Sequence, residues 1–154
     1  MPKIPLLRKD GSIRSYALVD DEDYKRFGHL RWSWHNQGYV SRKLSRRGPT
    51  VLLHRVIMGL EAGDKRQVDH KNRNGLDNRR SNLRIASHAQ NMQNRGLDKH
   101  NRSGYRGVSW EKRWQRWRAV IQVDGRQQHI GHFKNIEEAA SAVAEARAKT
   151  MPFA

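Results

Sequence analysis

The chain has 154 residues, enough for one domain or two small ones, and carries a formal net charge of +16. This balance favours a polyanionic partner, usually a nucleic acid, although a ribosomal type of protein would share it. The absence of cysteine excludes disulfides and cysteine-ligated zinc. The sequence has neither an apolar run of about 18 residues nor a secretory signal, so we expect a cytoplasmic protein without a membrane partner.

The first 48 residues predict short strands and turns. Asp10-Gly11 has the composition of a hairpin turn, and the acids of 20–23 suit the first turn of a helix. Trp32 and Trp34 fall on alternate positions, as on a half-buried strand. We therefore expect, in chain order, strands at 4–7 and 13–19, a helix beginning at 20–23, and strands at 30–34 and 39–44.

The middle segment predicts a compact strand and helix arrangement. Its apolar positions indicate a short helix over 51–60 that glycine ends near Gly59 or Gly63. Ser87 is placed to cap a further helix, and Gly96 to end it. The expected order is a strand ending at His70, a polar loop over 71–81, a strand at 83–86 and a helix over 88–95.

The carboxyl-terminal third predicts three strands and one helix. A polar linker at 99–104 precedes it. Asn135 and Glu138 have the spacing of a capping box, and small apolar residues along the following helix suit packing on a sheet. We expect strands at 105–111, 116–123 and 127–133 and a helix at 136–149.

Four side chains of the middle segment form a candidate catalytic set. Asp69 and His70 end the predicted strand, Asn82 lies 12 residues after His70, and Asn91 lies nine residues further on. A neutral imidazole suits proton abstraction from water near pH 7. Carboxylate and amide oxygens favour Mg²⁺ or Mn²⁺ over zinc. The set predicts metal-assisted hydrolysis of a phosphodiester, in which Asn82 fixes the imidazole ring.

The same residues resemble the HNH endonuclease motif, in the version found in phage and intron-encoded homing endonucleases. The resemblance rests on the spacing of the four residues and on the flanking Asp77-Asn78-Arg79 and Asn82-Leu83-Arg84. It implies two strands and a helix around one metal ion, with Asp69 and Asn91 as metal ligands, His70 as general base, and Asn82 as the residue that orients it. Asparagine at 91 stands where many relatives have histidine.

Further residues of this segment have open assignments. His54 contacts phosphate, braces the site, or is a packed structural histidine. Arginines near the motif are expected to bind phosphates that flank the cut: Arg79, Arg80 and Arg84.

The carboxyl-terminal third resembles the Apetala/ethylene-response-factor DNA-binding domain. The resemblance rests on Tyr105-Arg106-Gly107-Val108, the Trp114-to-Trp117 pair, Ile130-Gly131-His132-Phe133 and Glu137-Glu138-Ala139-Ala140. It implies a three-stranded sheet that faces DNA. A sheet of this kind can enter the major groove, where arginine and glutamine read base edges. The expected DNA-facing residues are Arg106, Trp110, Arg113, Arg116, Arg118, Gln122 and Arg126.

Together these features predict an α+β protein: an HNH ββα-metal nuclease core followed by a three-stranded antiparallel sheet packed on one helix. The expected division is an amino-terminal β-rich leader (1–48), the nuclease core (49–98), a linker (99–104) and the Apetala-like domain (105–154). The expected function is that of a DNA endonuclease, as in phage homing enzymes, with double-stranded DNA as partner, Mg²⁺ as the first-choice ion, and a monomer acting in the cytoplasm of a bacterial host. A non-catalytic DNA-binding regulator and an RNA-binding protein remain alternatives.

Overall fold

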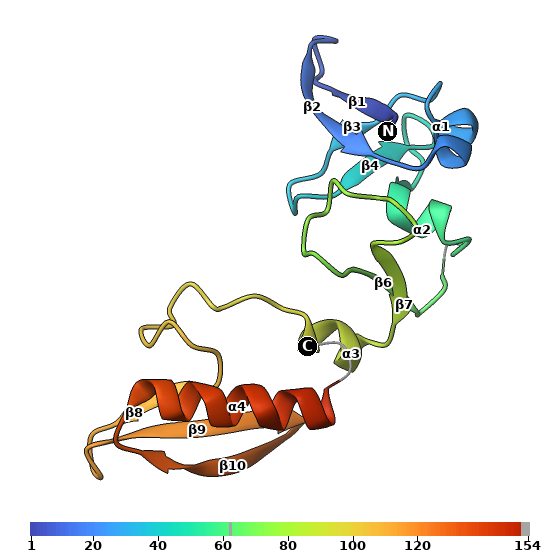
Figure 1. The fold of residues 1–154 in the computed structure, drawn as a ribbon. Helices are drawn as coiled ribbons and strands as arrows, with labels where there is room; N and C mark the ends of the chain where they lie inside the picture. Colours follow the sequence, from blue (N-terminus) through green and yellow to red (C-terminus); the bar gives the residue numbers. More distant parts are fainter. Residues whose placement is uncertain (62, 152–154) are drawn as a thin grey trace. The chain divides into compact units, whose positions relative to one another are not determined.

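Four small antiparallel sheets and four helices make up the described residues, 1–61 and 63–151, of this computed structural model (Figure 1). The chain divides into two compact units, Met1–His88 and Ala89–Ala154. Each unit has its own hydrophobic core and is described by itself. The fold class is therefore mixed α and β. Among the described residues, no helix has both the length and the apolar character that crossing a membrane requires.

The predicted hairpin begins the first unit. Strand β1 (Lys3–Leu7) pairs antiparallel with β2 (Ile13–Leu18). The connecting loop turns at Gly11, whose φ of 88° is accessible to glycine at little cost. The Asp10 carboxylate accepts the Ser12 backbone N–H at 2.9 Å, an interaction that stabilises such turns. The hairpin prediction is confirmed.

The rest of the leader contains one helix and a small sheet. Helix α1 (Asp21–Phe27) has its acids in the first turn, as predicted. The strand expected at 30–34 shortens to β3 (Ser33–Trp34), and Trp32 before it forms an isolated parallel bridge with Leu6 of β1. The Trp32 side chain is buried and donates its indole N–H to the Phe27 carbonyl at 3.0 Å. Strand β3 pairs with β4 (Val40–Lys43) across a turn at Gly38.

The helix predicted over 51–60 is confirmed in part, because it is shorter than expected. Val51 and Leu52 belong instead to β5 (Thr50–Leu52), which pairs with β4. Only α2 (Leu53–Ile57) is helical, and Gly59, with a φ of 69°, follows its end. A β-branched residue beside an open strand edge pairs more readily than it extends a short helix.

Two strands carry the first half of the predicted catalytic motif. Strand β6 (Gln67–His70) pairs antiparallel with β7 (Leu83–Ala86), so that Asp69 lies opposite Arg84 and His70 opposite Leu83. The polar segment 71–81 connects them as a loop. The predicted strand, loop and strand are confirmed.

One core joins the leader to this motif. The buried side chains come from both sides of residue 48, where a domain boundary was expected. They are Ile4, Leu6, Ala17, Val19, Trp32, Val40, Leu53, Ile57, Leu60, Val68 and Leu83. The leader is thus an integral part of the first unit.

The second unit contains the predicted sheet and helix. Helix α3 (His88–Gln93) begins at the junction of the units and is shorter than the predicted 88–95. Strands β8 (Val108–Glu111), β9 (Arg116–Val123) and β10 (Arg126–Phe133) form an antiparallel sheet in the order β10-β9-β8. Helix α4 (Ile136–Thr150) lies across one face of this sheet (Figure 1). The last three residues of the predicted domain, 152–154, lie outside the described residues.

Close packing of α4 on the sheet depends on small side chains. Ala139 and Val143 of α4 are buried against Ala119 and Ile121 of β9. Gly107 adopts a φ of 76°, and a Cβ there would collide with the Val120 carbonyl and touch Val143. Asn135 occupies the cap position of α4 but makes no side-chain cap hydrogen bond. Its Nδ2 instead donates to Glu138 Oε1 at 3.5 Å, so the predicted capping box is absent.

Candidate functional site

His70 ends β6 as a buried side chain with aromatic neighbours. Its ring stacks on Tyr39, with centroids 5.8 Å apart, and meets His54 at 5.0 Å with an interplanar angle of 82°. Burial lowers the pKa of His70, against the opposing effects of Asn78, Asp69 and Asp77. The imidazole is thereby favoured in its unprotonated form, which a general base requires.

His54 is buried in the same cluster, which favours its interpretation as a packed, bracing residue. The residue is 4% exposed, and its ring meets the Tyr39 ring edge to face with centroids 5.1 Å apart. Burial first, and the neighbouring His70 and Arg55 second, lower the pKa of His54 to about 3. Among the described residues, its Nδ1 is a buried atom without a hydrogen-bond partner. His54 is therefore neutral at pH 7 and packs as an aromatic ring beside the candidate base.

Asn82 lies close to His70 in the fold but bonds the loop. Its Nδ2 donates to the Asp77 carbonyl at 2.7 Å and to Asn72 Oδ1 at 3.0 Å, and its Oδ1 accepts from the Asn72 backbone N–H at 3.1 Å. Asn78 also meets the His70 ring, with its Oδ1 3.5 Å from Nε2. Asn82 was expected to orient His70; its side chain bonds the loop that carries Asn78, and a direct role toward His70 stays a prediction.

Asn78 and Tyr39 are neighbours of His70 that sequence reasoning did not assign. Asn78 was visible only as part of the motif Asp77-Asn78-Arg79, and it is 0% exposed. Tyr39 gives no sequence signal beyond its place after a turn. A Cβ at Gly75 would collide with the Gly38 carbonyl and with Tyr39, so loop 71–81 packs directly on the turn that presents this tyrosine.

Asp69 and Arg84 form an ion pair across β6 and β7. Asp69 Oδ2 accepts from Arg84 Nε at 2.8 Å and lies 2.8 Å from Nη2. The carboxylate is 6% exposed. Arg84, expected to bind phosphate, is therefore engaged with the carboxylate that was expected to bind metal, and it offsets the cost of burying that charge.

Two more arginines expected on phosphate are paired with carboxylates. Arg79 donates two hydrogen bonds to the Asp77 carboxylate, at 2.7 and 2.6 Å. This contact is the largest cause of the lowered pKa of Asp77. Arg80 grips Asp23 with two bonds of 2.8 Å. Bidentate pairs of this kind fix the guanidinium and compensate its charge. Phosphate binding by these arginines remains a prediction.

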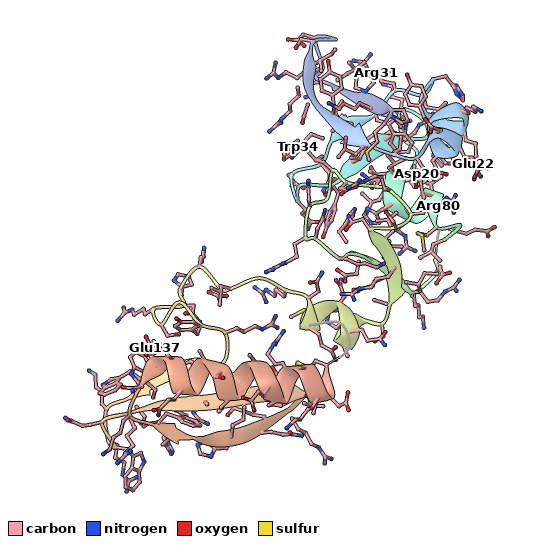
Figure 2. All side chains as sticks on the ribbon, in the orientation of Figure 1. Asp20, Glu22, Arg31, Trp34, Arg80 and Glu137 are labelled. Atoms are coloured by element: carbon pink, nitrogen blue, oxygen red, sulfur yellow. The ribbon has the colours of Figure 1, made fainter. Side chains whose placement is uncertain are left out.

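The Asp23–Arg80 pair connects the leader to the loop. Asp23 is fully buried on α1. The Asp20 carboxylate accepts the Arg80 backbone N–H at 2.8 Å (Figure 2 labels Asp20 and Arg80). Leu18 of β2 adds two backbone bonds of 2.8 Å, one to the Leu76 carbonyl and one from the Asn78 N–H. The leader thus holds the loop on which Asn78 lies. Acids at a helix start predicted only the helix, so this role had no sequence signal.

The donors of the motif fit a hard metal ion. Among the described residues, no three His, Asp or Glu side chains form a metal-binding group. The predicted set is one carboxylate, Asp69, and one amide, Asn91. A pair of oxygen donors suits Mg²⁺, which keeps several waters, and does not suit zinc. Asn91 belongs to the second unit, on α3, so its pairing with Asp69 stays a prediction.

The sheet of the second unit has a polar outer face. Ala119 and Ile121 of β9 point into the core, so Arg116, Arg118 and Gln122 point away from α4. Arg118 donates to Gln127 Oε1 at 2.9 Å, and the Gln122 side chain donates to the Gly125 carbonyl at 3.5 Å. This face brings together several of the residues predicted to meet DNA.

Other residues expected on DNA lie at the edges of this sheet. Arg126 is exposed at the start of β10. The Arg113 guanidinium lies over the Trp114 ring, 5.1 Å from its centroid. Trp110 is 47% exposed and meets Trp117 edge to face at 5.1 Å. Arg106 differs from the others, because its guanidinium bonds main-chain carbonyls at the end of α3.

Comparisons with known proteins bear on this motif. Residues 51–93 match the family model described as HNH endonuclease, and the match ends before the carboxyl-terminal sheet begins. Protein 3.8 of Escherichia phage T7 is 36% identical over 63 residues, which cover 41% of this chain and 52% of that protein. The chain therefore spans about half the length of the curated relative it matches. No solved structure matches it. The segment with Asp69, His70, Asn82 and Asn91 is thus similar to an HNH endonuclease.

Proposed function

We propose that the protein is an HNH-type DNA endonuclease that hydrolyses phosphodiester bonds with one divalent metal ion. The observation that carries the proposal is the buried Asp69–His70 pair at the end of β6, inside the segment that matches the HNH endonuclease model. Mg²⁺ is the expected ion and Mn²⁺ the alternative. The ββα arrangement of β6, β7 and α3 around this ion is part of the proposal.

The residues of the motif have separate roles in this hydrolysis. His70 accepts a proton from the attacking water, while Tyr39 and His54 enclose its ring and Asn78 contacts Nε2. Asp69 and Asn91 would hold the metal ion, which when bound would supply charge stabilisation to the phosphodiester. Arg84 keeps the Asp69 carboxylate oriented through its contact with Oδ2.

The second unit targets the nuclease to double-stranded DNA. Its outer sheet face presents cationic and amide side chains on a rigid scaffold, with Arg116, Arg118 and Gln122 at its centre. Side chains of these types bind phosphates and base edges. We propose that the protein acts as a monomer, in the manner of a phage homing enzyme, in the cytoplasm of a bacterial host.

Cleavage of supercoiled plasmid tests the proposal. We expect relaxed or linear product with Mg²⁺ and none with EDTA. His70→Ala and Asp69→Ala should each lower the rate by at least about a hundredfold, because each removes a separate part of the chemistry. His29→Ala, at an exposed histidine of the same unit, should cut like the parent. Thermal melting of every variant separates lost chemistry from lost fold.

The same experiment distinguishes the alternatives. A parent protein that binds plasmid without cutting it, with any divalent ion tried, is a non-catalytic DNA-binding regulator. Competition between duplex DNA and structured RNA at one salt concentration tests the RNA-binding alternative, since net charge alone attracts both. Stronger binding to RNA contradicts the endonuclease proposal.

A further inference from the structure

Helix α3, which carries Asn91, has no buried side chain to anchor it. It has six residues, and none of them is buried. Its first turn has no acidic residue and its last turn no basic one. A helix of this length is not stable alone in water, and most helices are held by a buried apolar face. The position of α3 therefore depends on contacts from elsewhere in the chain.

Two arginines of the second unit supply such contacts at the end of α3. Arg106, in the loop before β8, donates from Nη2 to the Met92 carbonyl at 2.7 Å and from Nη1 to the Gln93 carbonyl at 2.9 Å. Its Nη1 also contacts the Arg95 carbonyl. Arg147, on α4, donates to the Gln93 carbonyl at 2.9 Å. Both arginines are half-buried.

These contacts suit the chemistry of a helix end. The last carbonyls of a helix have no partner inside it and carry partial negative charge. A guanidinium group offers several donors in one plane, so one arginine can bond neighbouring carbonyls together. Both terminal nitrogens of Arg106 are engaged in this way.

We propose that Arg106 and Arg147 are positioning residues that fix α3, and with it Asn91, to the second unit. This inference rests on the proposed role of Asn91 as a metal ligand. Arg106 was expected to contact DNA; under this inference it supports the nuclease site instead. The second unit then has two roles, since the fold that presents a DNA-binding face also holds a helix needed for cleavage.

Three measurements on the full-length protein test the inference. In Arg106→Ala and Arg147→Ala, hydrogen exchange at the amides of 89–95 should accelerate about tenfold. Duplex DNA binding in EDTA, measured by fluorescence anisotropy, should stay at the parental level. The Mg²⁺ concentration that gives half-maximal cleavage should rise about tenfold, as expected when support of a metal ligand is lost. Arg106→Lys should give a smaller effect than Arg106→Ala, because its ammonium group can still donate to one of these carbonyls, although it cannot bond neighbouring carbonyls together as a guanidinium does.

Arg116→Ala is the matched control, because Arg116 lies on the outer sheet face. It should weaken DNA binding and leave exchange at 89–95 unchanged. If Arg106→Ala behaves like Arg116→Ala, Arg106 is a DNA contact and the inference is wrong. Unchanged exchange in both Arg106→Ala and Arg147→Ala overturns it as well. A parent protein that never cleaves overturns the proposed function and the role of Asn91, whereas the exchange data still decide whether these arginines hold α3.

Discussion

His54 is a buried histidine whose pKa is strongly lowered by its surroundings. It is buried, neutral and short of a partner for Nδ1, yet it lies against the candidate base. An apolar ring of similar shape would fill the same space without a buried polar atom. The histidine therefore has a measurable cost in stability, and this cost depends on pH.

The first prediction concerns that pH dependence. The pKa of His54 is about 3 in the folded protein and about 6.5 in an unfolded chain. The unfolded state thus binds more protons between these values, so stability is full above about pH 6.5 and falls as the pH drops. Urea unfolding should show a loss of about 2 kcal/mol between roughly pH 6.5 and 5.

His54→Phe should remove most of this loss, because phenylalanine keeps a ring in the cluster and does not titrate. His70, whose pKa is also lowered, accounts for a remainder. His29→Gln, at an exposed position, is the control and should keep the parental profile. A parental slope in His54→Phe would show that other groups cause the pH dependence.

At the scale of elements, loop 71–81 depends on the leader for its position. Backbone bonds from Leu18, the Asp20 carboxylate and the buried Asp23 all reach it. The loop carries Asn78, which contacts the candidate base. A helix far away in sequence therefore affects the geometry around His70.

The second prediction tests this dependence through Arg80. Arg80→Ala leaves the buried Asp23 carboxylate, among the described residues, with the Arg26 ion pair at 3.8 Å. The change should destabilise the protein by about 1–3 kcal/mol in urea unfolding, a value reduced by the partial exposure of Arg80. Plasmid cleavage should slow as well, because the loop next to His70 loosens.

A double-mutant cycle with Asp23→Ala isolates the pair. The double variant should be more stable than the sum of the single losses predicts, since neither charge is left alone. Arg66→Ala, which breaks an exposed pair with Asp64, is the control and should change the stability little, because water and salt screen an exposed pair. Additive losses for Arg80 and Asp23 would contradict a direct coupling.

The elements also show what the sequence could and could not predict. Turn residues and alternation located the first hairpin, β9 and α4 closely, because those signals depend on neighbours in the chain. The helix expected over 51–60 was too long, because pairing of β5 with β4 outweighed local helix preference at Val51 and Leu52 and left only α2 helical. Asp69 and His70 were recognisable from motif spacing. Tyr39 and Asp23 were not, since their contacts are long-range; Asp23 and Arg80 are 57 residues apart.

At the scale of the whole molecule, the distribution of charge matters more than its sum. The net charge is +16, but Arg79, Arg80 and Arg84, the three arginines of the motif that were expected to bind phosphate, are paired with Asp77, Asp23 and Asp69. Paired arginines attract phosphate less than their number implies. The outer face of the second unit is therefore the better candidate for initial contact with DNA.

The third prediction follows from this distribution. The logarithm of the DNA association constant, measured in EDTA, should fall linearly with the logarithm of salt concentration. Arg116→Ala and Arg118→Ala should each reduce the slope by about 1, as expected for loss of one phosphate contact. Arg66→Ala, at a paired surface arginine, should leave the slope unchanged. Equal slopes in all three variants would place the DNA contact elsewhere.

Residues 51–93 do not form a core of their own, so they would not fold as an isolated domain. Leu53, Ile57 and Val68 of that stretch are buried against side chains such as Ile4 and Trp32. In an isolated fragment of residues 51–93, each of these large apolar side chains would lose about 1.5–3 kcal/mol of the stabilising free energy of burial. A chimaeric nuclease built from this protein must therefore carry residues 1–50 along, either in the same polypeptide or as a complementing fragment.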